Sequence, residues 1–222
     1  MVKEGYKFGL PPLLLGVMAL AGGWNWMAAR WAGGVLIFLG LFVLYFFRDP
    51  DRAAPQDSDA VVSPADGHVV EIVDEDFDGR PGRRISIFLS VWDVHVNRAP
   101  VAGQIRKVDY KPGRFYAALR ARASTENEQN VIHLTTDRGE MVFKQIAGAI
   151  ARRVLCWKAP GDAVGIGERV GMIRFGSRVD VWLPREAEIV AKKGKFVAGG
   201  SSLLARWPLP NPGEPERGKG RG

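Results

Sequence analysis

Gly176 and Ser177 form a glycine-serine pair directly before an alternating stretch of residues, Val179 to Pro184. Glycine has no Cβ, so its carbonyl is sterically open and its backbone angles are free. The neighbouring serine hydroxyl can therefore approach that carbonyl in a strained geometry. The pair indicates a site of backbone chemistry. The chain has a second such pair, Gly200-Ser201. Glycine next to serine is also typical of an ordinary turn, so either pair could be one.

Two other segments carry side chains suited to proton transfer. Asp66 lies in the turn sequence Ser63 to Gly67, and His95 follows an apolar strand two residues after Asp93. A turn Asp commonly caps its own backbone, and a lone histidine commonly has a structural role. Imidazole, however, titrates near neutral pH. Asp66, His95 and Ser177 could form a charge-relay set, in which the carboxylate orients the imidazole and the imidazole takes the hydroxyl proton.

The chain has few residues that could bind a metal or provide a thiol. The three histidines, His68, His95 and His133, are scattered without the spacing of a ligand pair, so we predict no metal site. Cys156 is the single cysteine, so no intrachain disulfide can form, which is compatible with a reducing cytoplasmic face.

The N-terminal residues have a different character from the segments that carry these candidate residues. Leu10 to Ala21 and Trp31 to Phe47 are apolar and carry no charge, and each is short against the roughly 20 residues that span a bilayer comfortably. Pro11-Pro12 shortens the first further. We predict a membrane-associating helical hairpin over residues 1–48 that is re-entrant or barely spans. A cleaved signal peptide is disfavoured by the second apolar run, and a hairpin buried in a soluble core is the other alternative.

Basic residues flank this predicted hairpin on both sides. Lys3 and Lys7 precede it, and Arg48 and Arg52 follow it, which favours a cytoplasmic position for both ends. Arg30, in the intervening turn, weakens that assignment.

The rest of the chain has the pattern of a mostly-β (α+β) protein. The chain of 222 residues fits one globular domain with an extra segment at one end. After a polar linker at 49–60, we predict a compact β-sandwich or barrel-like domain over 61–207 and a disordered tail over 208–222. Predicted strands are Val69 to Val73, Arg84 to Leu89, Gln104 to Tyr110, Val131 to Leu134, Met141 to Gly148 and Arg178 to Leu183.

A basic and aromatic segment lies inside this domain. Arg114, Arg120 and Arg122 alternate with aromatic and aliphatic residues around the predicted helical or irregular patch, Phe115 to Ala123. Such a stretch can face an anionic lipid or a nucleic acid, or be a solvated helix face. Next to an apolar hairpin, a lipid surface is favoured. Nothing else in the chain indicates base recognition, so we predict no nucleic-acid partner.

An ordered series of blocks identifies a resemblance. It comprises Phe46 to Pro50, Ser63 to Gly67, the Phe88 to Pro100 segment, Ala123 to Glu128, Gln145 to Gly148 and Phe175 to Ser177. Together these resemble phosphatidylserine decarboxylase proenzymes, most closely the short bacterial form, up to about Arg206. The resemblance implies that the protein cuts itself between Gly176 and Ser177, so that Ser177 becomes a pyruvoyl cofactor and residues 1–176 and 177–222 stay associated. The resemblance favours this bond over Gly200-Ser201 as the cleavage site.

The same resemblance implies roles for three residues. Asp66 matches the charge-relay aspartate of the family, and His95 matches the first histidine of a block that contains two in long-form members. Arg98 occupies the second histidine position here. Either His95 performs the functions of both family histidines, or Arg98 contributes charge and another group supplies the base. Arg98, Arg114, Arg120 and Arg122 are candidates for binding lipid or substrate.

The implied reaction converts phosphatidylserine to phosphatidylethanolamine and CO₂ through a Schiff base, with the enzyme at the cytoplasmic face of a bacterial inner membrane and no metal. A homo-oligomer is compatible with this interpretation. The alternative is a membrane-anchored barrel-sandwich carrier or adaptor module, since Gly161 to Gly171 resembles the glycine-rich hairpins of lipoyl domains. No lysine lies in the context that such a carrier modifies. A structural membrane-anchored β protein is the third interpretation.

Overall fold

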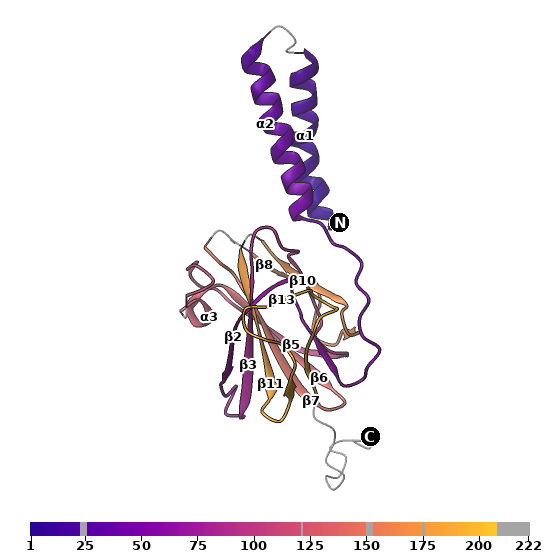
Figure 1. The fold of residues 1–222 in the computed structure, drawn as a ribbon, viewed down its shortest axis with the longest axis vertical. Coiled ribbons are helices and arrows are strands. Elements are labelled where there is room, and N and C mark those ends of the chain that lie inside the picture. Colours follow the sequence, from indigo (N-terminus) through magenta and orange to yellow (C-terminus); the bar gives the residue numbers. More distant parts are fainter. Residues whose placement is uncertain (23–25, 121, 150–152, 175, 208–222) are drawn as a thin grey trace.

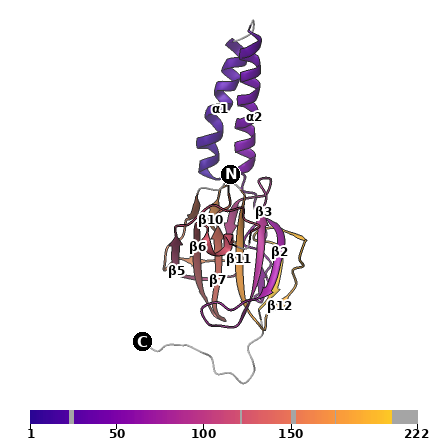
Figure 2. The ribbon, with the colours of Figure 1, turned by 90° about the vertical axis from the view of Figure 1, so that its left-hand side faces the viewer.

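The computed structural model describes residues 1–22, 26–120, 122–149, 153–174 and 176–207. A pair of N-terminal helices projects from one end of a β-rich domain, as both views show (Figure 1, Figure 2). The predicted fold class, a mostly-β domain preceded by an apolar helical hairpin, is confirmed. The predicted tail, 208–222, lies outside the described residues.

The two helices pack through paired glycines. Helix α1 is Lys3–Gly22 and helix α2 is Met27–Phe46. A Cβ on Gly16 would lie 2.7 Å from the Gly33 carbonyl oxygen, and one on Gly40 would lie 2.9 Å from that of Gly9. Such small residues allow two backbones to approach closely where lipid gives no hydrophobic drive. By length and composition, α2 is apolar enough to cross a membrane.

Helix α1 is longer than its apolar run because it continues through Pro11 and Pro12. Proline has a φ compatible with a helix but lacks an amide proton, so two carbonyls one turn earlier lose their usual donors. Contact with α2 at Leu13 and Gly40 supports this part of the helix. The proline pair therefore does not shorten α1 as predicted from the sequence.

The described residues form fourteen strands. These are β1 (Ala60–Val62), β2 (Gly67–Asp74), β3 (Gly82–Leu89), β4 (Val96–Arg98), β5 (Gly103–Lys111), β6 (Gln129–Thr136), β7 (Gly139–Ile146), β8 (Val154–Cys156), β9 (Ala163–Val164), β10 (Arg169–Ile173), β11 (Ser177–Pro184), β12 (Glu188–Ile189), β13 (Phe196–Val197) and β14 (Leu203–Arg206). The only helix among the described residues of this domain is α3, Ala123–Glu126.

Most of these strands belong to one curled antiparallel sheet. Its order is β13-β2-β3-β11-β7-β6-β5-β9, and two smaller sheets have the orders β1-β14-β12 and β4-β10-β8. Strand β11 lies inside the large sheet, paired with β3 on one side and β7 on the other. The segment that begins at Ser177 is therefore held by both neighbours.

Alternation along β11 separates an apolar face from a polar one. Val179, Val181 and Leu183 belong to the main hydrophobic core, whereas Arg178 and Asp180 point to the other face of the sheet. This alternation is what predicted the strand. The core is completed by the inward residues of the neighbouring strands, among them Ile85, Ile87, Leu89, Ile132, Leu134, Met141 and Phe143.

All six predicted strands are confirmed, with ends that differ by a few residues. The strands that were not predicted have between two and five residues, too short for alternation to be visible. The segment predicted to be helical or irregular, Phe115 to Ala123, is irregular in its described residues, and α3 begins only at Ala123.

Candidate active site

Gly176 and Ser177 lie at the start of β11, where the chain enters the sheet. Ser177 pairs with Leu89 of β3 and is fully buried. Gly176 has φ +57°, a left-handed conformation that glycine adopts at little cost and other residues resist. A glycine is therefore suited to the position directly before the buried serine.

The Gly176 carbonyl rests against the backbone of Gly148, two residues after β7 ends. A Cβ placed on Gly148 would lie 1.9 Å from the Gly176 carbonyl oxygen and 3.0 Å from its carbon. Any side chain at position 148 would have to displace this carbonyl. The sequence analysis included Gly148 in a family block but assigned it no role.

The Ser177 hydroxyl has no hydrogen-bond partner among the described residues, although its Oγ is buried. An unpaired buried hydroxyl costs about 1–3 kcal/mol, and such groups often mark functional sites. The oxygen lone pairs are not engaged by a donor in this part of the structure. Ser177 is therefore suited to act as a nucleophile.

His95 contacts the backbone of the glycine-serine pair. Its Nε2 accepts a hydrogen bond from the Gly176 N–H at 3.3 Å, and its Nδ1 lies 2.9 Å from the Asp93 carbonyl oxygen. Since Nε2 accepts and the partner of Nδ1 is a carbonyl, the proton resides on Nδ1. Burial lowers the pKa of His95 to about 4. The imidazole is thus neutral at pH 7, with its basic nitrogen directed at Gly176.

The base of the helical hairpin covers His95. The ring of Phe46, the last residue of α2, lies 4.2 Å from the imidazole, centroid to centroid, with an angle of 37° between their planes. Phe46, Phe47, Val96 and Met172 belong to one buried cluster that joins the hairpin to the β domain. The N-terminal hairpin and the histidine are therefore in direct contact, a relationship that no sequence pattern indicated.

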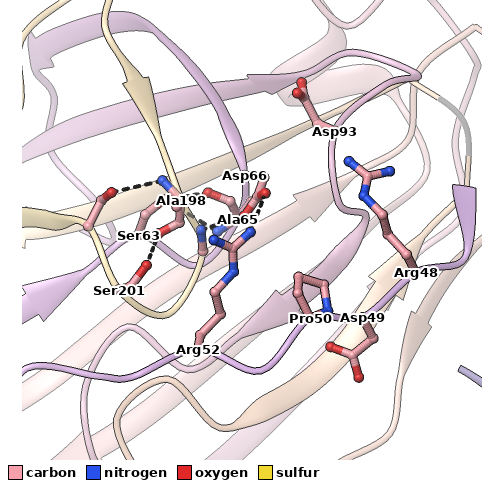
Figure 3. A network of polar contacts seen from close by, with 12 residues as sticks. Arg48, Asp49, Pro50, Arg52, Ser63, Ala65, Asp66, Asp93, Ala198 and Ser201 are labelled. Atoms are coloured by element: carbon pink, nitrogen blue, oxygen red, sulfur yellow. Dashed lines mark hydrogen bonds and ion pairs between the residues drawn. The ribbon is translucent and has the colours of Figure 1, made fainter. Parts of the chain in front are cut away.

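Asp66 lies on a neighbouring loop and has other partners. Its carboxylate accepts hydrogen bonds from the Arg52 guanidinium at 2.8 Å and from the Gly199 N–H at 2.7 Å (Figure 3). Burial is the largest influence on its pKa, which is raised. Among the described residues, no hydrogen bond joins Asp66 to His95 or Ser177. A relay role for Asp66 stays a prediction.

Arg98 binds the linker that follows the hairpin. Its guanidinium donates to the Asp49 carboxylate at 2.8 Å, the Pro50 carbonyl at 2.9 Å and the Gly167 carbonyl at 3.1 Å. Only 5% of Arg98 is exposed. In this arrangement its donors are directed at the linker and at Gly167, and Asp49 compensates its charge.

The three basic residues of the 114–122 region are exposed. Arg114 donates to the Tyr116 hydroxyl at 2.8 Å, while Arg120 and Arg122 lie in the turn before α3. Ala118, from the same region, is buried beside Gly148. The segment therefore borders the Gly176 carbonyl, with its arginines directed at solvent.

A network of charged side chains on the polar face of β11 was not predicted from the sequence. The Arg178 Nε donates to Asp180 at 2.6 Å, and its terminal nitrogen reaches Ser86 at 2.7 Å and Glu71 at 3.1 Å. Asp180 also accepts a hydrogen bond from Ser124 of α3 at 2.6 Å. Arg178 and Asp180 are buried. Their mutual compensation fixes the strand that carries Ser177.

No group of three or more His, Cys, Asp or Glu side chains in the described part of the chain could hold a metal ion. Cys156 is a free thiol, and burial raises its pKa. The described polar groups next to Gly176 include the Ser177 hydroxyl and the neutral imidazole of His95.

Comparisons with known proteins identify the family of this chain. Residues 39–205 match the family model described as phosphatidylserine decarboxylase. A phosphatidylserine decarboxylase proenzyme of Solibacter usitatus is 51% identical over 181 residues, which cover 82% of this chain and 86% of that protein. The proenzyme of Symbiobacterium thermophilum is 42% identical over 213 residues, 94% of this chain and 96% of that protein. The resemblance inferred from the sequence blocks is confirmed.

Proposed function

Because the chain belongs to the phosphatidylserine decarboxylase family, we propose that it is a proenzyme that cuts itself between Gly176 and Ser177 and then decarboxylates phosphatidylserine. The relatives are named as decarboxylase proenzymes, which supports an enzyme rather than a carrier or adaptor module. One observation carries the site assignment: the neutral His95 contacts Gly176, directly before the unpaired Ser177 hydroxyl.

Self-cleavage begins with the Ser177 hydroxyl. In our proposal, Nε2 of His95 exchanges the Gly176 N–H for the Ser177 Oγ–H and takes its proton, while Oγ attacks the Gly176 carbonyl carbon. The C–N bond of the peptide then breaks, the nitrogen receives the proton, and an ester links Gly176 to Ser177. The neutral state of His95 suits it to this step as a base.

Breaking the ester yields the two chains. A base removes the α-proton of Ser177, the Cβ–Oγ bond breaks, and Gly176 leaves as a carboxylate. Addition of water to the dehydroalanine that remains, with loss of ammonia, leaves a pyruvoyl group at position 177. The products would be residues 1–176 and 177–222. They would stay together because β11 lies between β3 and β7, which belong to the longer chain.

The site fits such a group, since position 177 begins a strand, is buried, and has no competing donor on its oxygen among the described residues. The pyruvoyl carbonyl would take the substrate amine as a Schiff base and accept the electrons released when CO₂ leaves. We propose His95 as the residue that moves protons at this position. Asp66 is retained as a candidate relay residue for His95, although among the described residues its carboxylate bonds Arg52 and Gly199.

The hairpin gives the enzyme access to its lipid substrate. We propose that residues 1–48 anchor the protein, 49–60 link the anchor to the catalytic domain at 61–207, and the domain faces the cytoplasm of a bacterial inner membrane. The apolar helix α2 and the flanking basic residues Lys3, Lys7 and Arg48 support this arrangement. Arg114, Arg120 and Arg122 are exposed and available to an anionic leaflet.

A direct assay tests the proposed activity. Purified protein in mixed micelles should release CO₂ from phosphatidylserine and leave phosphatidylethanolamine, and the Ser177→Ala chain should release none. Release of CO₂ by the Ser177→Ala chain at the wild-type rate would refute the assignment of Ser177.

A further inference from the structure

Arg174 lies in the chain between Ile173 and Gly176, whose backbone N–H groups both donate hydrogen bonds to His95. The Ile173 N–H donates to the His95 carbonyl oxygen at 3.2 Å, and the Gly176 N–H donates to His95 Nε2 at 3.3 Å. The Arg174 N–H bonds the Arg153 carbonyl at 3.3 Å, which holds the backbone here. The side chain at position 174 therefore begins two residues from the proposed cleavage site.

Among the described residues, no carboxylate compensates the charge of Arg174. Its Nε is buried and has no hydrogen-bond partner among the described residues, where no carboxylate forms an ion pair with it. The more deeply buried arginines of the domain, Arg84, Arg98 and Arg178, all pair with carboxylates. A partly buried guanidinium with unpaired donors calls for an anionic partner.

Arg174 lies beside the base of the hairpin, where lipid headgroups would be in the membrane arrangement proposed above. Its guanidinium carbon lies 5.6 Å from the ring centroid of Phe8, in α1, so the side chain reaches the base of the hairpin. Arg48, also at this base, already donates to the carbonyl oxygens of Tyr45 and Trp92. Arg174 thus combines open donors with a location where an apolar anchor meets the active site.

We propose that Arg174 binds the phosphodiester of the phosphatidylserine headgroup, an inference that rests on the proposed function. A guanidinium can donate two parallel hydrogen bonds to phosphate oxygens. The substrate carboxylate is the less suitable partner, because it leaves as neutral CO₂. An arginine paired with it would stabilise the substrate more than the transition state and would slow the reaction. The phosphodiester keeps its charge throughout, so binding it positions the lipid at no such cost.

The test compares the wild-type chain with Arg174→Gln, Arg174→Lys and the control Arg153→Gln, whose side chain is exposed one strand away. Soluble dihexanoyl phosphatidylserine is the substrate. Dihexanoyl phosphatidylglycerol, which has the phosphodiester but neither amine nor carboxylate, is the competitor. Arg174→Gln should raise KM about tenfold to a hundredfold and weaken inhibition by the competitor to a similar degree. Arg174→Lys should recover part of both, and Arg153→Gln should match the wild type.

Three results would overturn the inference. The first is an unchanged KM and inhibition constant in Arg174→Gln. The second is failure of Arg174→Gln to form two chains by intact mass, since self-cleavage needs no lipid and the residue would then act in maturation or folding. The third is inhibition of the wild type by inorganic phosphate as strong as that by the lipid competitor. A wild-type protein that releases no CO₂ would instead refute the proposed function and this inference with it.

Discussion

The ring of Phe46 packs against the imidazole of His95 with 4.2 Å between their centroids. Phe46 ends the apolar hairpin, whereas His95 follows the third strand of the β domain and contacts Gly176. The hairpin thus packs against the proposed base. Under the proposed function, this contact brings the membrane anchor close to position 177.

Replacement of Phe46 should disturb the site as well as the fold. Phe46→Ala removes a fully buried ring beside His95, which typically costs about 3–5 kcal/mol, and it removes the packing on that face of the imidazole. We expect a lower thermal midpoint and slower self-cleavage. Phe38→Ala, in the same helix but 66% exposed, is the matched control. Equal effects of the two substitutions on self-cleavage, followed by gel electrophoresis, would contradict the proposed contact.

Gly148 should be essential for cleavage because of the space that it leaves. Gly148→Ala would place a methyl group 1.9 Å from the Gly176 carbonyl oxygen and force that carbonyl to move. We expect self-cleavage to slow on the order of a hundredfold, as for other small displacements of reacting groups. Gly165→Ala, whose Cβ would meet only a side-chain oxygen at 3.8 Å, is the control. A folded Gly148→Ala chain, checked by near-UV circular dichroism, that cleaves at the wild-type rate would show this idea to be wrong.

The buried state of His95 should make stability depend on pH. Its pKa is lowered by burial to about 4, against about 6.5 in an unfolded chain. Between these values the unfolded chain binds more protons, so the free energy of unfolding should fall as pH falls from 6.5 to 4. The difference between the two pKa values corresponds to a loss of roughly 3 kcal/mol in the free energy of unfolding.

Urea unfolding in detergent measures this dependence. The uncut Ser177→Ala chain should lose stability across that pH range, and the Ser177→Ala, His95→Gln chain should lose much less. His133, whose pKa is also lowered chiefly by burial, is present in both chains, so it does not affect the comparison. Identical slopes would mean that His95 is not held neutral by the fold.

The glycine pairs should determine how tightly the hairpin closes. Gly33→Val would bring its Cβ within 2.9 Å of the Gly16 carbonyl oxygen, whereas position 34 has nothing within 4 Å. Overpacking of this kind typically costs about 1–3 kcal/mol. We expect Gly33→Val to reduce hydrogen-exchange protection of α1 in bicelles and Gly34→Val to leave it unchanged. Equal protection in both variants would argue against close packing at these glycines.

The sequence predicted the features that depend on local pattern. Alternation identified β11, because its neighbours on both sides leave one apolar and one polar face. The hairpin followed from two uncharged apolar runs. The start of α1 was predicted less well, since propensity alone does not show that packing against α2 supports the helix through Pro11 and Pro12.

The site depended on contacts between distant parts of the chain. Ser177 and His95 were predicted from type and resemblance, but their proximity arises from the way β10 passes β4 before β11 begins. Gly148 and Phe46 carry no chemical signal, because their effect is to leave or fill space near another segment. Arg174 resembles any other basic residue until the partners of its neighbours are known.

Intact-mass spectrometry of the full-length protein, purified from membranes and denatured, tests the central claim most directly. We predict two masses, for residues 1–176 and for 177–222 beginning with a pyruvoyl group, and a single uncut mass for Ser177→Ala. A single full-length mass from folded wild-type protein would contradict the account. So would a break between Gly200 and Ser201.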